Sequence, residues 1–143
     1  IKDNINLLHE LDQTIQIDFI HNNNKLFFNG DKEQLSRVFL NLIKNSIESI
    51  QEKRAYIHDL KGKIDIEIAD IDNYIVFNII DNGKGFGDLK DDFKNILNPY
   101  FTTKEKGTGL GLAIVNKIIN DHNGSINFKS LHLGAKISIK FTK

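Results

Sequence analysis

The sequence contains no cysteine, a single proline and no long apolar run, and its charges balance. Without cysteine, the chain has neither a disulfide framework nor a thiolate metal site, which is compatible with a reducing compartment. No apolar run approaches the roughly 20 residues that a transmembrane helix requires, and no charged-then-apolar signal segment opens the chain. Basic and acidic residues number 19 each, so no overall positive field favours nucleic acid, and we expect no nucleic-acid partner.

The length of 143 residues suits one domain with a single buried core, and we treat residues 1–143 as that domain. A hydrophobic fraction of 40% and a charged fraction of 27% are typical of a soluble globular protein. The chain begins with Ile1 rather than methionine, so we expect a fragment of a longer protein.

Apolar residues at helical spacing predict helices over residues 5–15, 31–53 and 108–122, with a short helical turn near 93–97 and Asp31 as an N-cap. Alternating apolar residues predict strands over 15–20, 25–29, 63–71, 73–80, 125–130 and 135–141. Together they predict an α+β fold, a two-layer sandwich in which a mixed, mostly antiparallel sheet carries about three helices on one face. Residues 82–107 are irregular, and such a long segment is usually a functional lid or disordered.

The first candidate site lies on the long predicted helix, where Asn41 and Asn45 are four residues apart and share one face. An amide oxygen is a neutral, hard ligand that suits Mg²⁺, an ion that usually binds through few protein groups and the phosphates of a substrate. Asparagine is common in this chain, however, so this spacing also arises by chance. The pair alone leaves both interpretations open.

The second candidate is the segment DNGKGFG, residues 81–87, which follows an apolar strand. The carboxylate of Asp81 can accept a hydrogen bond from an adenine amino group, and Gly83 and Gly85 let the backbone approach a flat base. The same residues also fit an ordinary turn after a strand. Taken alone, the segment is compatible with either interpretation.

The third candidate is NPYFTTKEKGTGLGLAIV, residues 98–115, in which three alternating glycines straddle the start of a predicted helix. Free N–H groups and the helix dipole make a helix N-terminus an anion site, and glycine removes side chains that would hold phosphate oxygens away. The spacing fits neither a P-loop nor a dinucleotide fingerprint. Polar residues just upstream can also contact phosphate oxygens: Thr102, Thr103 and Lys104.

The order of these segments resembles that of the ATP-binding catalytic domain of sensor histidine kinases, in the superfamily that also holds DNA gyrase, mismatch-repair and heat-shock chaperone ATPases. The resemblance covers nearly the whole chain. The family's N box is similar to DKEQLSRVFLNLIKNSIESI, and its first glycine box is similar to DNGKGFG. Its F box is similar to NPYFTTK, and its second glycine box is similar to GTGLGLAIV. Its closing hairpin is similar to HNGSI together with GAKISIKF. The N box and second glycine box look most like the nitrogen-regulation type of sensor kinase. The family has the Bergerat fold.

The resemblance implies a role for each motif. Asn45 would ligate Mg²⁺, with Asn41 beside it near the phosphates, and Asp81 would bind the adenine amino group of ATP. Residues from about 87 to 107 would form a long flexible ATP lid. The remaining implied nucleotide contacts lie in the glycine boxes, the F box and the lid: Gly83, Gly85, Phe101, Thr102, Thr103, Gly107, Thr108, Gly109, Leu110 and Gly111.

The resemblance also implies an activity. ATP-hydrolysing members place a Glu one helical turn before the metal asparagine, whereas this chain has Asn41 there, which has no useful basicity. A neutral imidazole needs no base to attack a γ-phosphate, so a protein-histidine kinase is favoured over an ATPase. Many histidine kinases carry Lys or Arg three residues after the metal asparagine, where this chain has Glu48. The phosphate-neutralising cation therefore stays open among three candidates, Lys44, Lys104 and Arg37.

None of the five histidines follows the phosphoacceptor pattern. The segment LLHEL around His9 is superficially similar to it, but this segment lies directly before the first predicted strand. The acceptor histidine would then lie on a dimerisation domain outside this chain, and a response regulator would receive the phosphoryl group. We expect the chain to be monomeric and cytoplasmic, and the full-length protein to be a homodimer anchored in the inner membrane. Two alternatives stay open: a nucleotide-binding regulatory module without transfer (a pseudokinase) and, less favoured, a gyrase-type ATPase.

Overall fold

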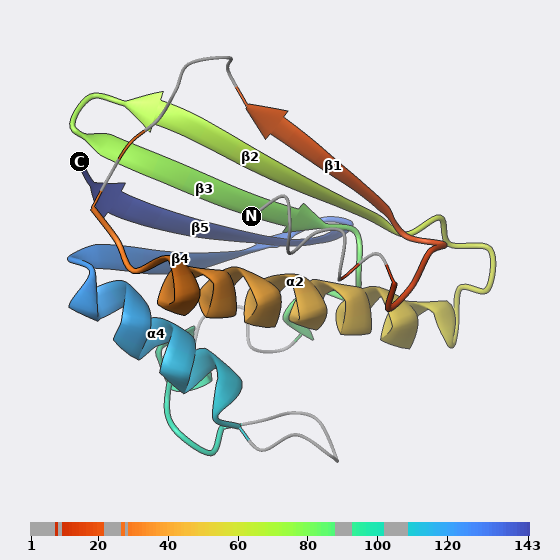
Figure 1. Cartoon of the computed structure of the whole chain (residues 1–143). Helices are drawn as coiled ribbons and strands as arrows, with labels where there is room; N and C mark the ends of the chain where they lie inside the picture. Colours follow the sequence, from red (N-terminus) through yellow and green to blue (C-terminus); the bar gives the residue numbers. More distant parts are fainter. Residues whose placement is uncertain (1–7, 9, 22–26, 28, 88–92, 102–108) are drawn as a thin grey trace.

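The computed structural model describes residues 8, 10–21, 27, 29–87, 93–101 and 109–143 of the chain (Figure 1). Within these residues, five strands form one sheet in the order β1-β2-β3-β5-β4, in which β1 runs parallel to β2 and the other neighbours are antiparallel. The predicted α+β sandwich with a mixed, mostly antiparallel sheet is therefore confirmed. The elements in chain order are β1 (Gln16–His21), α2 (Lys32–Arg54), β2 (Lys63–Ile71), β3 (Tyr74–Asp81), α3 (Phe93–Ile96), α4 (Gly111–Asp121), β4 (Gly124–Leu131) and β5 (Gly134–Thr142).

Helix α2 is long and crosses one face of the sheet (Figure 1). The Asp31 carboxylate caps its N-terminus, because it accepts from the backbone N–H groups of Glu33 and Gln34 at 2.9 and 3.0 Å. The helix ends at Arg54, close to the predicted end. Its apolar stripe is buried as the spacing predicts: Leu35, Val38, Phe39, Leu42, Ile43, Ile47 and Ile50.

The two hairpins of the sheet supply the other half of the core. Strands β2 and β3 pair around Asp72–Asn73, as predicted, and Asp72 has a φ of 53°. Alternate residues of each strand face the helices, so Phe77 and Ile79 of β3 are buried while Asn78 between them lies on the opposite face. Burying each such apolar side chain contributes roughly 1.5–3 kcal/mol.

Helix α4 lies beside α2 on the same face of the sheet (Figure 1), and one histidine joins the two helices. The backbone N–H of Asp31 donates to Nε2 of His122 at 3.0 Å, and Nδ1 of the same ring lies 2.7 Å from the Ile118 carbonyl oxygen. The ring therefore accepts at Nε2 and donates from Nδ1. This pair of bonds fixes the end of α4 to the start of α2. In the described part of the chain, no helix has the length and apolar character that crossing a bilayer requires.

Two predicted elements near the N-terminus are wrong at the residues that the structure describes. The predicted helix over 5–15 does not reach its end, because residues 10–15 form turns in which the Asp12 carboxylate accepts from Thr14. Residues 1–7 and 9, with His9, lie outside the described part. The predicted strand over 25–29 is absent at Phe27 and Asn29, its two described residues. Strand β1 pairs in parallel with β2 instead.

Helix α4 begins at Gly111, three residues later than predicted. Gly109 has a φ of +69°, which lies far outside the helical range. Thr108, the predicted start, lies outside the described residues. The predicted helical turn near 93–97 is confirmed as α3.

Candidate functional site

Asp81 is the last residue of β3, and its side chain is only 6% exposed. Its Oδ2 accepts from the Ser46 hydroxyl of α2 at 2.9 Å, and its Oδ1 accepts from the Gly83 backbone N–H at 2.9 Å. Burial raises the pKa of the Asp81 carboxyl, although the hydrogen bonds from Gly83 and Ser46 and the charge of Lys53 oppose that rise. A buried carboxylate with fixed orientation is a strong and selective acceptor for an amino group.

The backbone after Asp81 packs so closely against its neighbours that glycine is required. A Cβ built on Gly83 would lie 2.8 Å from the backbone carbonyl carbon of Ser49 on α2. Gly85 has a φ of +70°, and a Cβ there would lie 2.8 Å from the Gly134 carbonyl oxygen. These glycines therefore hold the segment after β3 against both α2 and the start of β5.

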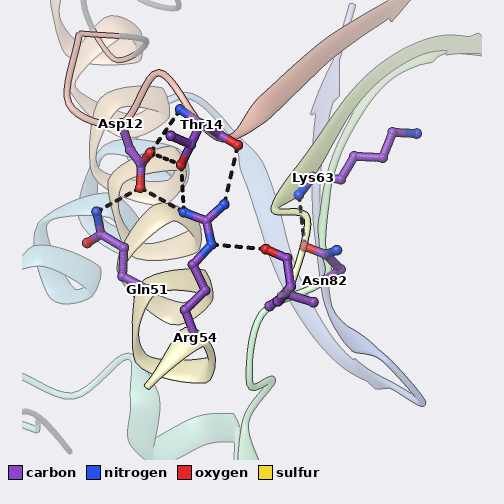
Figure 2. Close-up of polar contacts among 7 residues, drawn as sticks. Asp12, Thr14, Gln51, Arg54, Lys63 and Asn82 are labelled. Carbon is purple, nitrogen blue, oxygen red and sulfur yellow. Dashed lines mark hydrogen bonds and ion pairs between the residues drawn. The ribbon is translucent and has the colours of Figure 1, made fainter. Parts of the chain in front are cut away.

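Asn82, between Asp81 and these glycines, anchors the same turn to the start of β2. Its Oδ1 accepts from the Lys63 backbone N–H at 2.9 Å, a bond that Figure 2 shows. Its Nδ2 donates to the Lys61 carbonyl oxygen at 2.7 Å. The turn that carries Asp81 is thus held on the β2 side as well.

Arg54, the last residue of α2, fixes the segment before β1 to that helix (Figure 2). Its Nη1 lies 3.1 Å from Asp12 Oδ2 and donates to the Thr14 hydroxyl at 2.8 Å, while its Nε donates to the Leu60 carbonyl oxygen at 3.1 Å. Burial raises the pKa of Asp12, but the hydrogen bonds from Thr14 and Gln51 and the charge of Arg54 outweigh it and hold that pKa below its usual value. This Arg54 cluster stabilises the end of α2.

Asn41 of α2 lies beside the start of α4. Its Nδ2 donates to the Arg37 carbonyl oxygen at 2.9 Å, and a Cβ built on Gly111 would lie 3.3 Å from its Oδ1. The amide oxygen therefore faces the first residue of α4. Asn45 lies half-buried one turn further along α2, next to the Ser46 that binds Asp81. One helix thus carries both candidate metal amides and the hydroxyl that supports the buried carboxylate.

The start of α4 is joined to the F box. Leu110, the N-cap residue, has no side-chain acceptor that could cap the first N–H groups of α4, and a helix start of this kind is a common anion site. The Gly109 carbonyl oxygen accepts from the Tyr100 backbone N–H at 2.9 Å, and a Cβ on Gly109 would lie 2.3 Å from the Tyr100 carbonyl carbon. Phe101 next to Tyr100 packs against the core. The F box and the second glycine box are thus brought together at one end of α4.

Lys44 is exposed on α2, and with Arg37 and Asn41 it lines a cavity of about 560 Å³ that Leu8 and Leu11 border from the N-terminal segment. Two of the candidate phosphate-binding cations therefore lie on the same side of α2 as Asn41. The other predicted contacts lie outside the described residues: Thr102, Thr103, Lys104, Gly107 and Thr108. The predicted lid over 87–107 is described at residues 87 and 93–101.

Residues 30–143 match the family of histidine kinase-, DNA gyrase B- and HSP90-like ATPases. The chain belongs to this family. It is 37% identical over 119 residues to sporulation kinase A of Bacillus subtilis, which covers 82% of this chain and 18% of that protein. It is 36% identical over 132 residues to a putative NtrY-like sensor histidine kinase of Rickettsia felis, which covers 92% of this chain and 21% of that protein.

Among solved structures, the catalytic domain of the histidine kinase ThkA matches with a TM-score of 0.78 at 28% identity, over 100% of this chain and 92% of that one. The resemblance to histidine kinase catalytic domains, including the nitrogen-regulation type, is therefore confirmed. The chain spans about a fifth of the length of the curated relatives it matches, 18% and 21% for the two above.

Membership among these ATPase domains implies ATP binding, and the residues present fit a magnesium ion that accompanies the nucleotide. The Asn41 oxygen faces the first residue of α4, so one neutral oxygen ligand lies beside a helix start, and Asn45 follows one turn later on α2. A site with few protein oxygens leaves the other ligand positions to phosphate and water, as Mg²⁺ prefers.

Two supporting residues of this histidine kinase catalytic domain escape the sequence reasoning. Ser46 falls within the buried stripe of α2, where a polar side chain needs a hydrogen-bond partner. A serine at such a position is the sequence signal that could have indicated its role. Lys53 lies seven residues later on the same face, but its partners are backbone carbonyls that no sequence motif marks.

Proposed function

We propose that the chain binds Mg-ATP and donates the γ-phosphoryl group to a histidine on a separate dimerisation domain of a sensor kinase. The observation that carries the proposal is the buried Asp81 carboxylate, which α2 supports through Ser46 while the same helix presents Asn41 to the start of α4. Base recognition and phosphate binding would thereby share one rigid helix. Asp81 would accept from the adenine amino group, and the segment around Gly85 would flank the base.

The phosphate end of the nucleotide would lie between α2 and the start of α4. Asn45 would ligate Mg²⁺ with Asn41 beside it, and the backbone N–H groups at Leu110 and Gly111 would donate to phosphate oxygens. The magnesium ion, when bound, neutralises charge on the phosphates. Phe101 would anchor the lid, and Thr102, Thr103, Gly107 and Thr108 would contact the nucleotide. Lys44, Lys104 and Arg37 are the candidates for the remaining positive charge.

Transfer to histidine is favoured over hydrolysis because of Asn41. An amide has no basicity with which to activate a water molecule, and its Nδ2 already donates to the Arg37 carbonyl oxygen. A neutral imidazole nitrogen can attack the γ-phosphorus without such a base. An N–P bond forms, the bond between phosphorus and the β,γ-bridging oxygen breaks, and ADP leaves. In-line positioning and charge neutralisation then supply the catalysis.

The partners of this reaction would lie outside the chain. They are a dimerisation domain that carries the acceptor histidine and a response regulator that receives the phosphoryl group. We propose a monomer for this chain, a homodimer for the full-length protein, and a position on the cytoplasmic side of the membrane.

Calorimetric titration with ADP and with a non-hydrolysable ATP analogue, each with and without Mg²⁺, tests the binding half of the proposal. We expect one saturable site per chain, with Mg²⁺ strengthening the binding of the triphosphate analogue. Asp81→Asn serves as the control that removes the acceptor for the base. A titration that stays flat at millimolar nucleotide would contradict the proposal.

Transfer is tested separately, because a pseudokinase would bind nucleotide in the same way. Radiolabelled ATP is mixed with the chain and with a histidine-bearing dimerisation domain supplied in trans. We expect acid-labile label on the acceptor, which Asn45→Ala should reduce strongly at saturating nucleotide. Normal binding without labelled acceptor would favour the pseudokinase, and release of phosphate without acceptor would favour a gyrase-type ATPase.

A further inference from the structure

The Lys53 ammonium makes three hydrogen bonds to backbone carbonyl groups. It donates to the oxygens of Asn82 at 2.9 Å, Gly83 at 3.0 Å and Leu133 at 3.1 Å. A lysine ammonium has three protons, so these bonds use its full donor capacity. Lys53 is half-buried in the last turn of α2, and a side chain so completely engaged is not a solvated surface charge.

The three carbonyls belong to the two turns that meet at Asp81. Asn82 and Gly83 directly follow the carboxylate, and Leu133 lies in the turn between β4 and β5. The two turns are in tight contact, since a Cβ on Gly134 would lie 1.9 Å from the Asp81 carbonyl oxygen. Lys53 therefore joins α2, the turn after β3 and the β4–β5 turn at a single point.

The field of Lys53 acts on the same carboxylate, because its positive charge favours the ionised form and lowers the pKa of Asp81 against the effect of burial. Two other charged residues of these elements, Glu52 of α2 and Lys84 of the turn, pair with each other. Lys84 is tied to α2 as well, since its backbone N–H donates to the Ser49 hydroxyl at 3.1 Å. Removing Lys53 thus takes away both the anchor and the compensating charge.

We propose that Lys53 is a positioning residue for base recognition: by clamping the turn after β3 to the β4–β5 turn, it aims the Asp81 carboxylate at the amino group of the purine. This inference rests on the proposed nucleotide binding and adds the residue that sets its selectivity. Lys53 does not touch the nucleotide. It acts through the backbone that follows Asp81 and through the β4–β5 turn.

The test compares Lys53→Met with Arg54→Met in calorimetric titrations of ADP and of inosine diphosphate, which carries a carbonyl where adenine carries its amino group. Arg54 is the matched control, because it is the next residue of the same helix turn and its contacts are those of the Arg54 cluster (Figure 2). In the unmodified chain and in Arg54→Met, ADP should bind much more tightly than inosine diphosphate. In Lys53→Met, ADP binding should weaken by roughly tenfold or more while inosine diphosphate changes little, so selectivity collapses.

The ratio of the two dissociation constants separates this effect from partial unfolding, because a reversibly unfolded fraction weakens the apparent binding of both nucleotides by the same factor. A second readout is the pH at which ADP binding is lost on acidification, which should move upward in Lys53→Met and stay in place in Arg54→Met. If Lys53→Met does not fold, Lys53→Gln, which keeps two donor protons, replaces it in the same titrations.

Unchanged selectivity in the folded Lys53 variant, with normal binding by the unmodified chain, would overturn the positioning role alone. Absence of ADP binding in the unmodified chain would overturn the proposed function and this inference with it. Equal loss of selectivity in the Lys53 and Arg54 variants would also contradict the inference, since it would indicate a general loosening of the end of α2.

Discussion

The Ser46 hydroxyl oxygen and Asp81 Oδ2 lie 2.9 Å apart, and the two residues are 2% and 6% exposed. In the part of the chain that the structure describes, every other buried side chain is apolar. A buried carboxylate weakens a core unless donors surround it, and this one receives a bond from the helix and a bond from the turn. The proposed recognition of the nucleotide gives this carboxylate a role that stability alone does not.

Asp81→Asn should separate recognition from stability. Asparagine can keep the bond from Gly83 and can pair with Ser46 after rotation of the hydroxyl, so the hydrogen bonds persist without a buried charge. We expect ADP affinity to fall at least about 100-fold, or roughly 2.8 kcal/mol. The melting temperature at pH 8 should rise by about 2–4 °C. Titration calorimetry and thermal unfolding on the same sample test both parts. Retained affinity would contradict the role of Asp81, and a lower melting temperature would contradict the cost assigned to its charge.

Nucleotide binding should weaken on acidification at a higher pH than an ordinary aspartate would dictate. Burial raises the folded-state pKa of Asp81, so the carboxylate takes up its proton earlier as the pH falls and loses acceptor capacity. The same shift means that ionisation of Asp81 costs stability as the pH rises from the unfolded to the folded pKa. ADP titrations between pH 8 and pH 4 measure the midpoint. If ADP binding is lost only near the ordinary carboxyl pKa, the raised pKa of Asp81 is contradicted.

Ser46→Ala should lower both stability and affinity. It removes one of the two hydrogen bonds described above for the Asp81 carboxylate, a loss of about 1.5–3 kcal/mol, which corresponds to a melting-temperature decrease of roughly 5 °C. ADP affinity should fall because the carboxylate loses its support from α2. Ser125→Ala, at an exposed position of β4, is the matched control and should change neither quantity. Equal melting temperatures for the two variants would count against the Ser46 bond.

Gly109→Ala should be far more disruptive than Gly87→Ala, although both residues have positive φ, +69° and +54°. Alanine at residue 87 meets nothing within 4 Å among the described residues and carries only the strain of its backbone, about 1 kcal/mol. Alanine at residue 109 also collides with the backbone of Tyr100, so we expect a loss of roughly 3 kcal/mol or more. Urea unfolding of both variants measures the difference. Similar losses would mean that backbone strain, rather than the collision, dominates.

Asp12→Asn should destabilise the chain by about 1 kcal/mol near neutral pH, since it weakens a partly buried ion pair with Arg54. The folded-state pKa of Asp12 is depressed, so its contribution is present above the unfolded pKa and is lost as the pH falls through the folded pKa. The melting temperatures of the unmodified chain and the variant should therefore converge below the ordinary carboxyl range. ADP affinity at pH 7 should be unchanged. A difference in melting temperature that persists at low pH would contradict the ion pair between Asp12 and Arg54.

The parts of the fold that follow from local patterns are those that the sequence predicts well. The stripe from Leu35 to Ile50, the Asp31 cap and the Asp72 turn each depend on neighbours in sequence, and all three are confirmed. The sequence could not predict that β1 pairs with β2, because a parallel pairing across an intervening helix leaves no local sequence signal. The roles of Asn45 and of the glycine boxes stay predictions. The contacts of Lys53 could not be anticipated, since backbone carbonyls are the same at every residue.

The parallel pairing of β1 with β2 has a consequence for the order in which the sheet assembles. The antiparallel pairs β2–β3 and β4–β5 close through two-residue turns, whereas Gln16 meets Lys63 only after the whole of α2 has folded back. Among the strands that the structure describes, β1 also lies at the edge of the sheet, next to β2 alone. It should therefore join last during folding and detach first in native-state opening, so its amide protons exchange with solvent ahead of those of β3. The N-terminal edge of the domain can then loosen while the central strand that carries Asp81 remains paired on both sides.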